Sequence, residues 1–354
     1  MKPGIREKAV TIKDIAEYCG VSKSLVGYIL SNSPTRHGSP EVRQRVLEAA
    51  RKLGYRPNRA AKMLVGQSSR LIGICICSQM PPVLFRCLAA MEREAKKRGY
   101  QLMISESFGM PEDLLQSYYT FMEYGINGVI FLGVEHPRDR EQIRAGFLDA
   151  RNLLFMGQSP LESACCVDVD WGAGCYAGAE HFIRCGRRCP ALVVDRLPFG
   201  SILSRIHGFQ EAMRRAGRVE GRDFFISRLD YTLDRERMRN EIIRVLEEEL
   251  LPNRVDAVMI QNDVYAASLL QALSRRGIRV PDDMAVIGFD DELFSSATIP
   301  PLATVDQNVE QQAVAAINLL VAQINADGEL PAEQRSIRIP CSLVLRESAG
   351  IPTA

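Results

Sequence analysis

Polar side chains follow the carboxyl ends of two apolar runs in the second half of this chain. The run VDAVMIQ leads into Asn262 and Asp263, and AVIGF leads into Asp290 and Asp291. A third run, ALVVD, is followed by a loop and by Arg205 at the start of the next predicted helix. A carboxylate and an amide can chelate adjacent hydroxyls while an arginine donates in a fork. This set therefore suits a neutral polyhydroxylated ligand.

Other residues of this region have a structural alternative. Asp263 and Asp291 occupy positions where helix N-caps are common. Ser78 follows the apolar run 71–77 and is a further polar candidate by the same strand-end reasoning. Three aromatic residues are candidates for stacking on a sugar face, although burial statistics favour a core position for each: Phe85, Trp171 and Phe289.

The elements that must position these side chains are alternating strands and helices. Amphipathic helical patterns, for example 83–98 and 236–250, separate apolar runs that predict buried strands: LIGICIC, QLMIS, GVIFLG, NLLFMG, ALVVD, DAVMIQ and MAVIGF. Such alternation predicts a parallel sheet covered on both faces, with ligands beyond the carboxyl ends of its strands. About 280 residues exceed what one sheet needs, so we expect two α/β lobes. The sequence contains neither a GxGxxG motif after a strand nor a GxxxxGK[ST] motif, so no motif supports nucleotide chemistry.

The distribution of charge separates a head from a body. The net charge of the 354 residues is +1, but residues 1–70 contain 14 Lys and Arg against 5 Asp and Glu, whereas the remainder contains 30 against 38. A small basic head on a mildly acidic body is typical of a polyanion-binding module joined to something else. The alternative is a solvated lysine-rich face.

Composition and motifs exclude several classes of protein. Apolar residues make up 46% and charged residues 25%, as in soluble globular proteins, and neither a membrane span nor a secretory signal is present, so we expect a cytoplasmic protein. We expect the ten cysteines to be reduced and mostly buried, because the Cys185 and Cys189 pair has no second pair to complete a metal site. The four histidines are scattered and no Ser-His-Asp arrangement is evident, so we expect neither an enzyme nor a cofactor.

The head begins with two short helices around one turn. Thr11 and Asp14 predict a capping box and a helix that starts at about Ile12 and ends at Gly20. Ser22 caps a second helix to about Leu30. Its inward residues are Val26, Ile29 and Leu30, and its outward residues are Lys23, Ser24, Gly27 and Tyr28. This pattern predicts a helix-turn-helix whose second helix reads base edges in the major groove.

A third helix and a short fourth one follow. Ser39 as N-cap, Pro40 and the stop at Gly54 bound the third helix. The stretch YRPNRAAKMLVGQSS predicts a helix of about two turns that ends at Gly66. Because a helix that short is marginal alone, we expect it to be ordered only against a partner or ligand, as a hinge.

Several segments, in their order along the chain, resemble the lactose-repressor (LacI/GalR) family of bacterial transcription regulators. They are VTIKDIAEYCGVSKSLVGYIL, VRQRVLEAARKLGYRPNRAAKML, RLIGICI, VDVDWGAGCYAGAEHFIRCGRR, IHGFQEAM, VDAVMIQND, AVIGFDDELFSSATIPPLATV and LVLRES. The resemblance implies a helix-turn-helix domain at 8–56, a hinge helix and linker at 57–70, and a two-lobe, periplasmic-binding-protein-like domain at 71–350 for effector binding and dimerisation.

The resemblance also implies roles for single residues. Lys23 and Ser24 would contact bases. Phosphates would be contacted by Ser22, Asn32 and the stretch 55–58. Leu64 would be wedged in the minor groove, where Ala61 lets two hinge helices approach each other. The whole DNA-binding prediction is Thr11, Ser22, Lys23, Ser24, Tyr28, Asn32, Tyr55, Asn58, Arg59, Ala61 and Leu64. The effector-binding prediction is Ser78, Phe85, Trp171, Arg205, Asn262, Phe289 and Asp290, of which the family itself points to Arg205, Asn262 and Asp290.

The recognition helix departs from the family pattern. Where the family shows a Thr-Val-Ser-Arg-Val run, this chain has residues 25–29, Leu-Val-Gly-Tyr-Ile. A phosphate-binding hydroxyl and a base-reading arginine are both missing. Tyr28 can touch a base edge or a thymine methyl, or it can pack on the first helix. The operator sequence therefore cannot be inferred from relatives.

The resulting hypothesis is a dimeric DNA-binding repressor controlled by a sugar or sugar derivative between two lobes. Two heads would bind half-sites of a near-palindromic double-stranded operator, and the lobe orientation would act on the hinge helices through residues 67–70. An apolar heptad tail is absent after LVLRESAGIPTA, which favours a dimer. The alternatives are a solute-binding protein of a sugar transport system and an α/β enzyme acting on a sugar.

Overall fold

The computed structural model of the chain describes residues 10–30, 38–56, 68–77, 81–107, 111–133, 140–147 and 150–350. The chain forms two compact units, Met1–Ser69 and Arg70–Ala354, which we call the head and the body. The hinge helix predicted within 57–66 lies outside the described residues.

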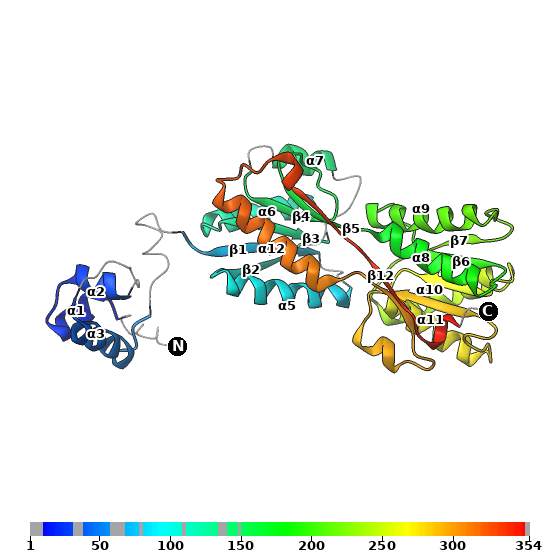
Figure 1. The fold of residues 1–354 in the computed structure, drawn as a ribbon, viewed down its shortest axis with the longest axis horizontal. Helices are drawn as coiled ribbons and strands as arrows, with labels where there is room; N and C mark the ends of the chain where they lie inside the picture. Colours follow the sequence, from blue (N-terminus) through cyan, green and yellow to red (C-terminus); the bar gives the residue numbers. More distant parts are fainter. Residues whose placement is uncertain are drawn as a thin grey trace, which may run out of the picture. The chain divides into compact units, whose positions relative to one another are not determined.

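The described part of the head has three helices whose ends follow local sequence signals. They are α1 (Ile12–Cys19), α2 (Lys23–Leu30) and α3 (Pro40–Lys52) (Figure 1). The capping box predicted for Thr11 and Asp14 is present, with the Asp14 carboxylate accepting from the Thr11 backbone N–H at 2.7 Å. Gly20 ends α1 with φ 65°, a conformation that costs glycine little because it has no Cβ. The capping signals therefore predicted these helices to within a residue.

The three helices of the head enclose one small apolar core. Ile15, Val26 and Val46 are each 0% exposed and come from α1, α2 and α3 respectively. Ala16 is also buried, as expected for a small residue where two helices cross. This packing fixes which side of α2 is left for solvent.

The body is built from two six-stranded sheets. Its elements, in chain order, are β1 (Leu71–Cys77), α5 (Pro82–Lys97), β2 (Gln101–Ser107), α6 (Pro111–Glu123), β3 (Gly128–Leu132), α7 (Arg140–Gly146), β4 (Leu153–Met156), β5 (Cys165–Val169), α8 (Trp171–Arg184), β6 (Pro190–Asp195), α9 (Gly200–Arg215), β7 (Phe225–Leu229), α10 (Arg235–Arg244), β8 (Ala257–Ile260), α11 (Asp263–Arg275), β9 (Ala285–Phe289), β10 (Ala303–Asp306), α12 (Val309–Asn325), β11 (Ser336–Ile339) and β12 (Ser342–Val344).

Each sheet is the centre of one lobe. The first lobe has strand order β11-β5-β4-β3-β1-β2, with every neighbouring pair parallel. The second has order β12-β10-β9-β8-β6-β7, in which only the β10–β12 pairing is antiparallel. The prediction of two α/β lobes with parallel sheets is confirmed.

Helices cover both faces of each sheet, as a mostly parallel sheet requires. In the first lobe α5 and α12 share one apolar core, and α6 and α7 share another (Figure 1). In the second lobe α10 and α11 cover one face, and α8 and α9 the other. The large buried side chains, such as Phe131 and Phe209, each stabilise the fold by about 2 kcal/mol through removal from water.

The chain crosses between the lobes at three places. These are the links from β5 to α8, from β10 to α12 and from β11 to β12. Trp171, the first residue of α8, therefore lies directly after one crossing. Side chains near these links are placed where both lobes can act on them.

Two details of the predicted strands were wrong or incomplete. QLMIS forms most of β2, but β2 is an edge strand and Ile104 is 50% exposed, so it is not the buried strand that its apolar residues predicted. Strands β5, β7, β10, β11 and β12 were not among the predicted strands. Polar residues within them, such as Asp168 and Arg228, interrupt the apolar runs on which the prediction relied.

Candidate DNA interface and effector site

One side of α2 is available for a partner. Val26 and Ile29 pack into the head core, at 0% and 2% exposure. Lys23 and Ser24 on the other side are exposed, and so is Tyr28 at 47%. A helix that presents its N-terminal polar side chains in this way can enter a major groove.

Two residues predicted to bind DNA also cap the N-termini of helices. The Ser22 hydroxyl accepts from the Leu25 backbone N–H at 3.2 Å, and the Thr11 hydroxyl donates to the Asp14 carboxylate at 2.8 Å. Tyr55 packs against the head core, and burial raises the pKa of its phenol. Five predicted DNA-binding residues lie outside the described residues: Asn32, Asn58, Arg59, Ala61 and Leu64.

The second lobe brings three of the predicted effector residues together. The Arg205 guanidinium carbon lies 4.3 Å from the Trp171 ring centre and 4.5 Å from that of Phe289. The two rings are 6.2 Å apart and tilted by 50°, so the guanidinium lies in the angle between them. Cation–π attraction of this kind is strongest where water is excluded, and Arg205 is only 7% exposed.

Close helix packing explains this juxtaposition. Gly172 follows Trp171 at the start of α8, and Gly208 lies one turn after Arg205 in α9. A Cβ on Gly208 would lie 2.0 Å from the Gly172 backbone oxygen. Because neither glycine has a side chain, α8 and α9 cross with their backbones in contact, which holds Trp171 against Arg205.

Arg205 has aromatic neighbours but no acceptor. Its Nε is buried without a hydrogen-bond partner. Among the residues that the structure describes, none accepts a hydrogen bond from this guanidinium or forms an ion pair with it. Arg205 lies in the second turn of α9, not at its start as predicted. A guanidinium with a buried, unsatisfied Nε is expected of a ligand contact.

Phe289 occupies the core position that burial statistics favoured. Its ring is 0% exposed at the end of β9, so stacking on a sugar face is replaced by stacking on Arg205. Trp171 is only partly buried and keeps some accessible surface. Phe85, in the first turn of α5, is 58% exposed and no contact joins it to this group in the described residues. Ser78 lies outside the described residues.

Asp290 follows Phe289 in an unusual backbone conformation, with φ 107°. Its carboxyl Oδ1 accepts from the Gln307 side-chain amide at 2.7 Å. Burial raises the pKa of Asp290 well above its ordinary range, and the nearby Asp263 adds to the shift, whereas Arg205 acts in the opposite direction.

The capping roles proposed for Asp263 and Asp291 were wrong. Asn262 is the N-cap of α11, since its side-chain oxygen accepts from the Tyr265 backbone N–H at 2.9 Å. Asp291 precedes only a short 3₁₀ turn that begins at Leu293, and it binds Arg346 at 2.7 Å instead. Asn262 can still present its amide nitrogen to a ligand while it caps the helix.

Asp263 fixes the loop that carries Asp290. Its carboxylate accepts from the Ser295 and Thr304 hydroxyls, both at 2.6 Å, and from the Glu292 backbone N–H at 2.9 Å. It fits beneath β9 because a Cβ on Gly288 would lie 2.1 Å from its oxygen. Burial raises the pKa of Asp263 to about 6, against the effect of its hydrogen bonds.

Arg86 links the two lobes at this loop, a role that our sequence reasoning missed. From α5 of the first lobe, it donates to the backbone oxygens of Asp290 at 3.1 Å and Asp291 at 2.6 Å. The signal was available, because Arg86 lies at the start of the second turn of the helix that follows β1. The same strand-end reasoning that selected Arg205 would have selected it.

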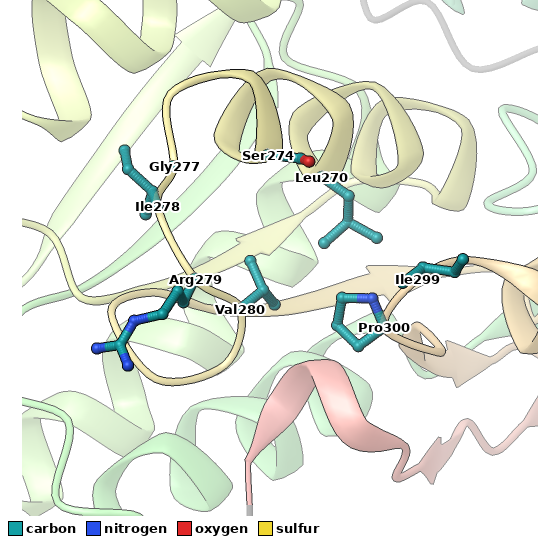
Figure 2. Close-up of a pocket in the computed structure, with 8 residues that line it drawn as sticks. All are labelled: Leu270, Ser274, Gly277, Ile278, Arg279, Val280, Ile299 and Pro300. Atoms are coloured by element: carbon teal, nitrogen blue, oxygen red, sulfur yellow. The ribbon is translucent and has the colours of Figure 1, made fainter.

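A surface hollow lies elsewhere on the second lobe. Figure 2 shows it between the carboxyl end of α11 and two loops, lined by Leu270, Ser274, Gly277, Ile278, Arg279, Val280, Ile299 and Pro300. Ile299 at its edge is 93% exposed. The hollow includes none of the predicted effector residues.

Metal and thiol chemistry have no assembled site in the described part of the chain. No group of three His, Cys, Asp or Glu side chains there could hold a metal ion. Cys185 contacts His181 at 3.3 Å, and the other cysteines that are free thiols in the described residues are Cys19, Cys87, Cys165, Cys166, Cys175, Cys189 and Cys341. None of the described helices combines the length and apolarity that crossing a membrane requires.

Comparison with known proteins relates both units to one kind of regulator. Residues 11–58 match the model "Bacterial regulatory proteins, lacI family", and residues 179–349 match "Periplasmic binding protein-like domain". The HTH-type transcriptional repressor PurR of Histophilus somni is 28% identical, over 96% of this chain and 98% of its own. The PurR repressor of Haemophilus influenzae is 26% identical over the same shares.

Solved structures give the same result for the fold. The lac repressor dimer, solved bound to operator and the anti-inducer ONPF, superposes with a TM-score of 0.82 at 25% identity, covering 97% of this chain and 99% of that chain. A complex of the transcriptional regulator CelR with cellobiose superposes with a TM-score of 0.68 at 23% identity, covering 96% and 99%. These relatives share the order of a helical head followed by two α/β lobes.

Proposed function

We propose, from the premise that the chain belongs to the lacI family of bacterial regulatory proteins, that its head binds a near-palindromic double-stranded operator as one half of a homodimer. The chain is a DNA-binding repressor controlled by an effector, and it is not an enzyme. Repressors of this family bind operator DNA as dimers with effector ligands. Action on chromosomal DNA places the protein in the cytoplasm.

The observation that supports operator binding best is the exposed face of α2. Lys23 and Ser24 lie at the N-terminal end of a helix whose other side is fully packed. These two side chains contact bases in our proposal, and Tyr28 contacts a base edge or a thymine methyl. The domain limits 8–56, 57–70 and 71–350 belong to the same proposal. So do contacts of Ser22, Asn32 and the stretch 55–58 with phosphates, of Leu64 and Ala61 in the minor groove, and of Thr11 and Arg59 with the DNA.

The effector in this proposal is a sugar or sugar derivative bound between the lobes. Arg205, Asn262 and Asp290 offer a donor fork, an amide and a carboxyl group at the carboxyl ends of neighbouring strands. Because Arg86 joins the first lobe to the backbone of Asp290, a ligand at Asp290 acts on the contact between lobes. That contact is the element through which effector and operator affinities become coupled.

Operator binding is tested by selecting duplexes from fragmented genomic DNA and measuring affinity at several salt concentrations. Phosphate neutralisation releases counterions, so affinity for the selected duplex should fall steeply with salt. Preference for that duplex over random DNA should remain at each concentration. Equal affinity for selected and random duplexes would contradict the proposal.

The homodimer is supported by apolar surface on the second lobe. Ile299 at 93% exposure and Leu293 at 86% follow β9, and the hollow of Figure 2 lies beside Ile299. Sedimentation of Ile299→Asp should show a shift from dimer to monomer. Val219→Asp, at an apolar position that is 50% exposed elsewhere on the lobe, is the matched control and should remain dimeric. A dimeric Ile299→Asp protein would place the interface on another face.

A further inference from the structure

Gly27 lies in the interior of α2, where glycine is an unfavourable residue. It is the fifth of the eight residues from Lys23 to Leu30. Glycine destabilises a helix interior more than any residue except proline, because its backbone loses the most conformational freedom on folding. An interior glycine on a short helix therefore needs a reason that outweighs this loss of helix stability.

Packing and backbone conformation within the protein do not supply that reason. The backbone at Gly27 is α-helical and has no positive φ, unlike Gly20, whose φ of 65° ends α1. A Cβ at Gly27 would meet no atom of another element within 4 Å among the residues that the structure describes. Gly208 is the opposite case, since its Cβ would lie 2.0 Å from the Gly172 backbone oxygen. The space at Gly27 is therefore open to a partner from outside the chain.

Gly27 lies in the middle of the exposed face of α2. Each residue turns an α-helix by about 100°, so Gly27 lies about 40° from Lys23 and about 60° from Ser24 around the helix axis, between the two. Lys23 and Ser24 are exposed, and Tyr28 is 47% exposed. The long side chains of Lys23 and Tyr28 are at the margins of this face. Between them are the short side chain of Ser24 and the bare backbone of Gly27.

The chemistry of this bare position selects one kind of group on DNA. A phosphate needs donors, but Gly27 has no side chain and its backbone N–H is bonded within the helix. Its Cα offers only C–H surface, which suits an apolar group. The C5-methyl group of thymine is the only apolar group that the base pairs present in the major groove.

We propose that Gly27 is a specificity-determining residue that receives the C5-methyl group of one thymine in each half-site of the operator. The inference rests on the operator binding proposed above and adds a base contact to it. Lys23 and Tyr28 flank the methyl group, and the missing side chain lets the backbone of α2 approach the base. A methyl side chain at position 27 would occupy the volume that the thymine methyl needs, so the two groups exclude each other.

The test exchanges one methyl group between the protein and the DNA. Full-length wild type and Gly27→Ala are compared on the duplex selected from genomic DNA. In that duplex, thymine is replaced by uracil at one position of each half-site at a time. At one position uracil should weaken binding of the wild type by about fourfold per half-site, the worth of one buried methyl group.

The variant should show the reverse preference at the same position. Gly27→Ala should bind the thymine duplex at least about tenfold more weakly than the wild type, which is the usual cost of one wrong contact at a base pair. It should recover affinity on the uracil duplex, because the methyl group that it adds then replaces the one that the DNA has lost. A change that only altered the fold would not depend on the position of uracil.

Two controls separate this contact from a change in the head. Amides of α2 in full-length Gly27→Ala should exchange hydrogen more slowly than in the wild type, because alanine favours the helix. Weaker operator binding would then accompany a more stable helix. Gln44→Ala changes an exposed residue of α3 that donates to Glu48 at 2.7 Å, and it should bind the thymine and uracil duplexes like the wild type.

Equal affinity of wild type and Gly27→Ala for the thymine duplex would overturn the proposed contact. So would a loss of affinity in Gly27→Ala that uracil reverses at no position. If random DNA shared that loss, the DNA backbone rather than a base would lie against Gly27. The proposed function fails in a different way, because the wild type would then prefer no selected duplex over random DNA.

Discussion

The candidate DNA interface and the candidate effector site are built in opposite ways. Lys23, Ser24 and Tyr28 are exposed side chains on a helix whose packing is done by other residues. Arg205 and Phe289 are themselves part of the packed interior of the second lobe. A surface site can change its specificity without changing the fold, whereas a buried site must satisfy packing, charge and ligand with the same atoms.

Matched glycine substitutions give the largest contrast between the two regions. In Gly208→Ala the new Cβ would lie 2.0 Å from the Gly172 backbone oxygen. Urea unfolding should therefore show that the free energy of unfolding of the body falls by about 3 kcal/mol. In Gly27→Ala on α2 the Cβ meets nothing within 4 Å. Because alanine favours the helix more than glycine does, the free energy of unfolding of the head should rise by about 1 kcal/mol. Equal effects of the two changes would remove the distinction drawn between surface and buried sites.

Asp263 makes the stability of the body depend on pH. Because burial raises its pKa to about 6, the folded state holds the proton more tightly than the unfolded state, whose pKa is about 4. Stabilisation by this proton is present below pH 4 and is lost as the pH rises to about 6.

The stability advantage of wild type over Asp263→Asn should therefore shrink between these pH values by about 3 kcal/mol in chemical unfolding. Thr304→Val removes one donor to Asp263 and keeps the carboxyl group, so its stability should depend on pH in the same direction, with the transition at higher pH because this hydrogen bond lowers the pKa of Asp263. An advantage that grows with pH would mean that Asp263 is ionised in the fold at low pH.

Lys23→Ala should change operator recognition and leave stability unchanged. Loss of a base contact should cost about 1.5 kcal/mol of discrimination between the selected operator and random DNA. Lys13→Ala, in which an exposed lysine paired with Glu17 at 3.6 Å is removed from α1, is the control. Fluorescence anisotropy should show that this control weakens binding to both duplexes equally or not at all. A uniform loss in Lys23→Ala would indicate a phosphate contact instead.

The smallest expected effect concerns the link between lobes. Arg86→Ala removes the hydrogen bonds to the Asp290 and Asp291 backbones and should cost about 1 kcal/mol in unfolding. Arg93→Ala on the same helix removes an exposed ion pair with Glu310 and should cost less than about 0.5 kcal/mol. If Arg86→Ala leaves the effect of an effector on operator affinity unchanged, this link does not transmit it.

Local signals made the head more predictable than the body. The Thr11 and Asp14 capping box, Gly20 and Ser39 are defined by neighbours along the chain, so each helix end could be located. Strand β2 looked buried from its apolar residues, but its edge position depends on strand order, which no local pattern gives. Asn262 caps α11 where Asp263 was the capping candidate, because a shift of one residue in the start of the helix decides which side chain reaches the free backbone N–H groups.

The candidate effector site combines residues that the sequence could indicate with contacts that it could not. The strand-end rule selected Arg205, Asn262 and Asp290 and suggested a neutral ligand. Trp171 and Phe289 enclose Arg205, and no acceptor accompanies them in the described part of the body. This arrangement depends on the crossing of α8 and α9 at Gly172 and Gly208. This crossing is a tertiary contact, and two isolated glycines in helical segments are not enough to predict it.

The central claim is that occupancy of the Arg205 site in the body sets the operator affinity of the head. The most direct test takes the compound that shifts Trp171 fluorescence and measures operator affinity of wild type and Arg205→Gln across its concentration. The account predicts a change of about five- to a hundredfold in the wild type, the usual range of coupling between two sites, and none in the variant. The same change in both proteins would contradict it.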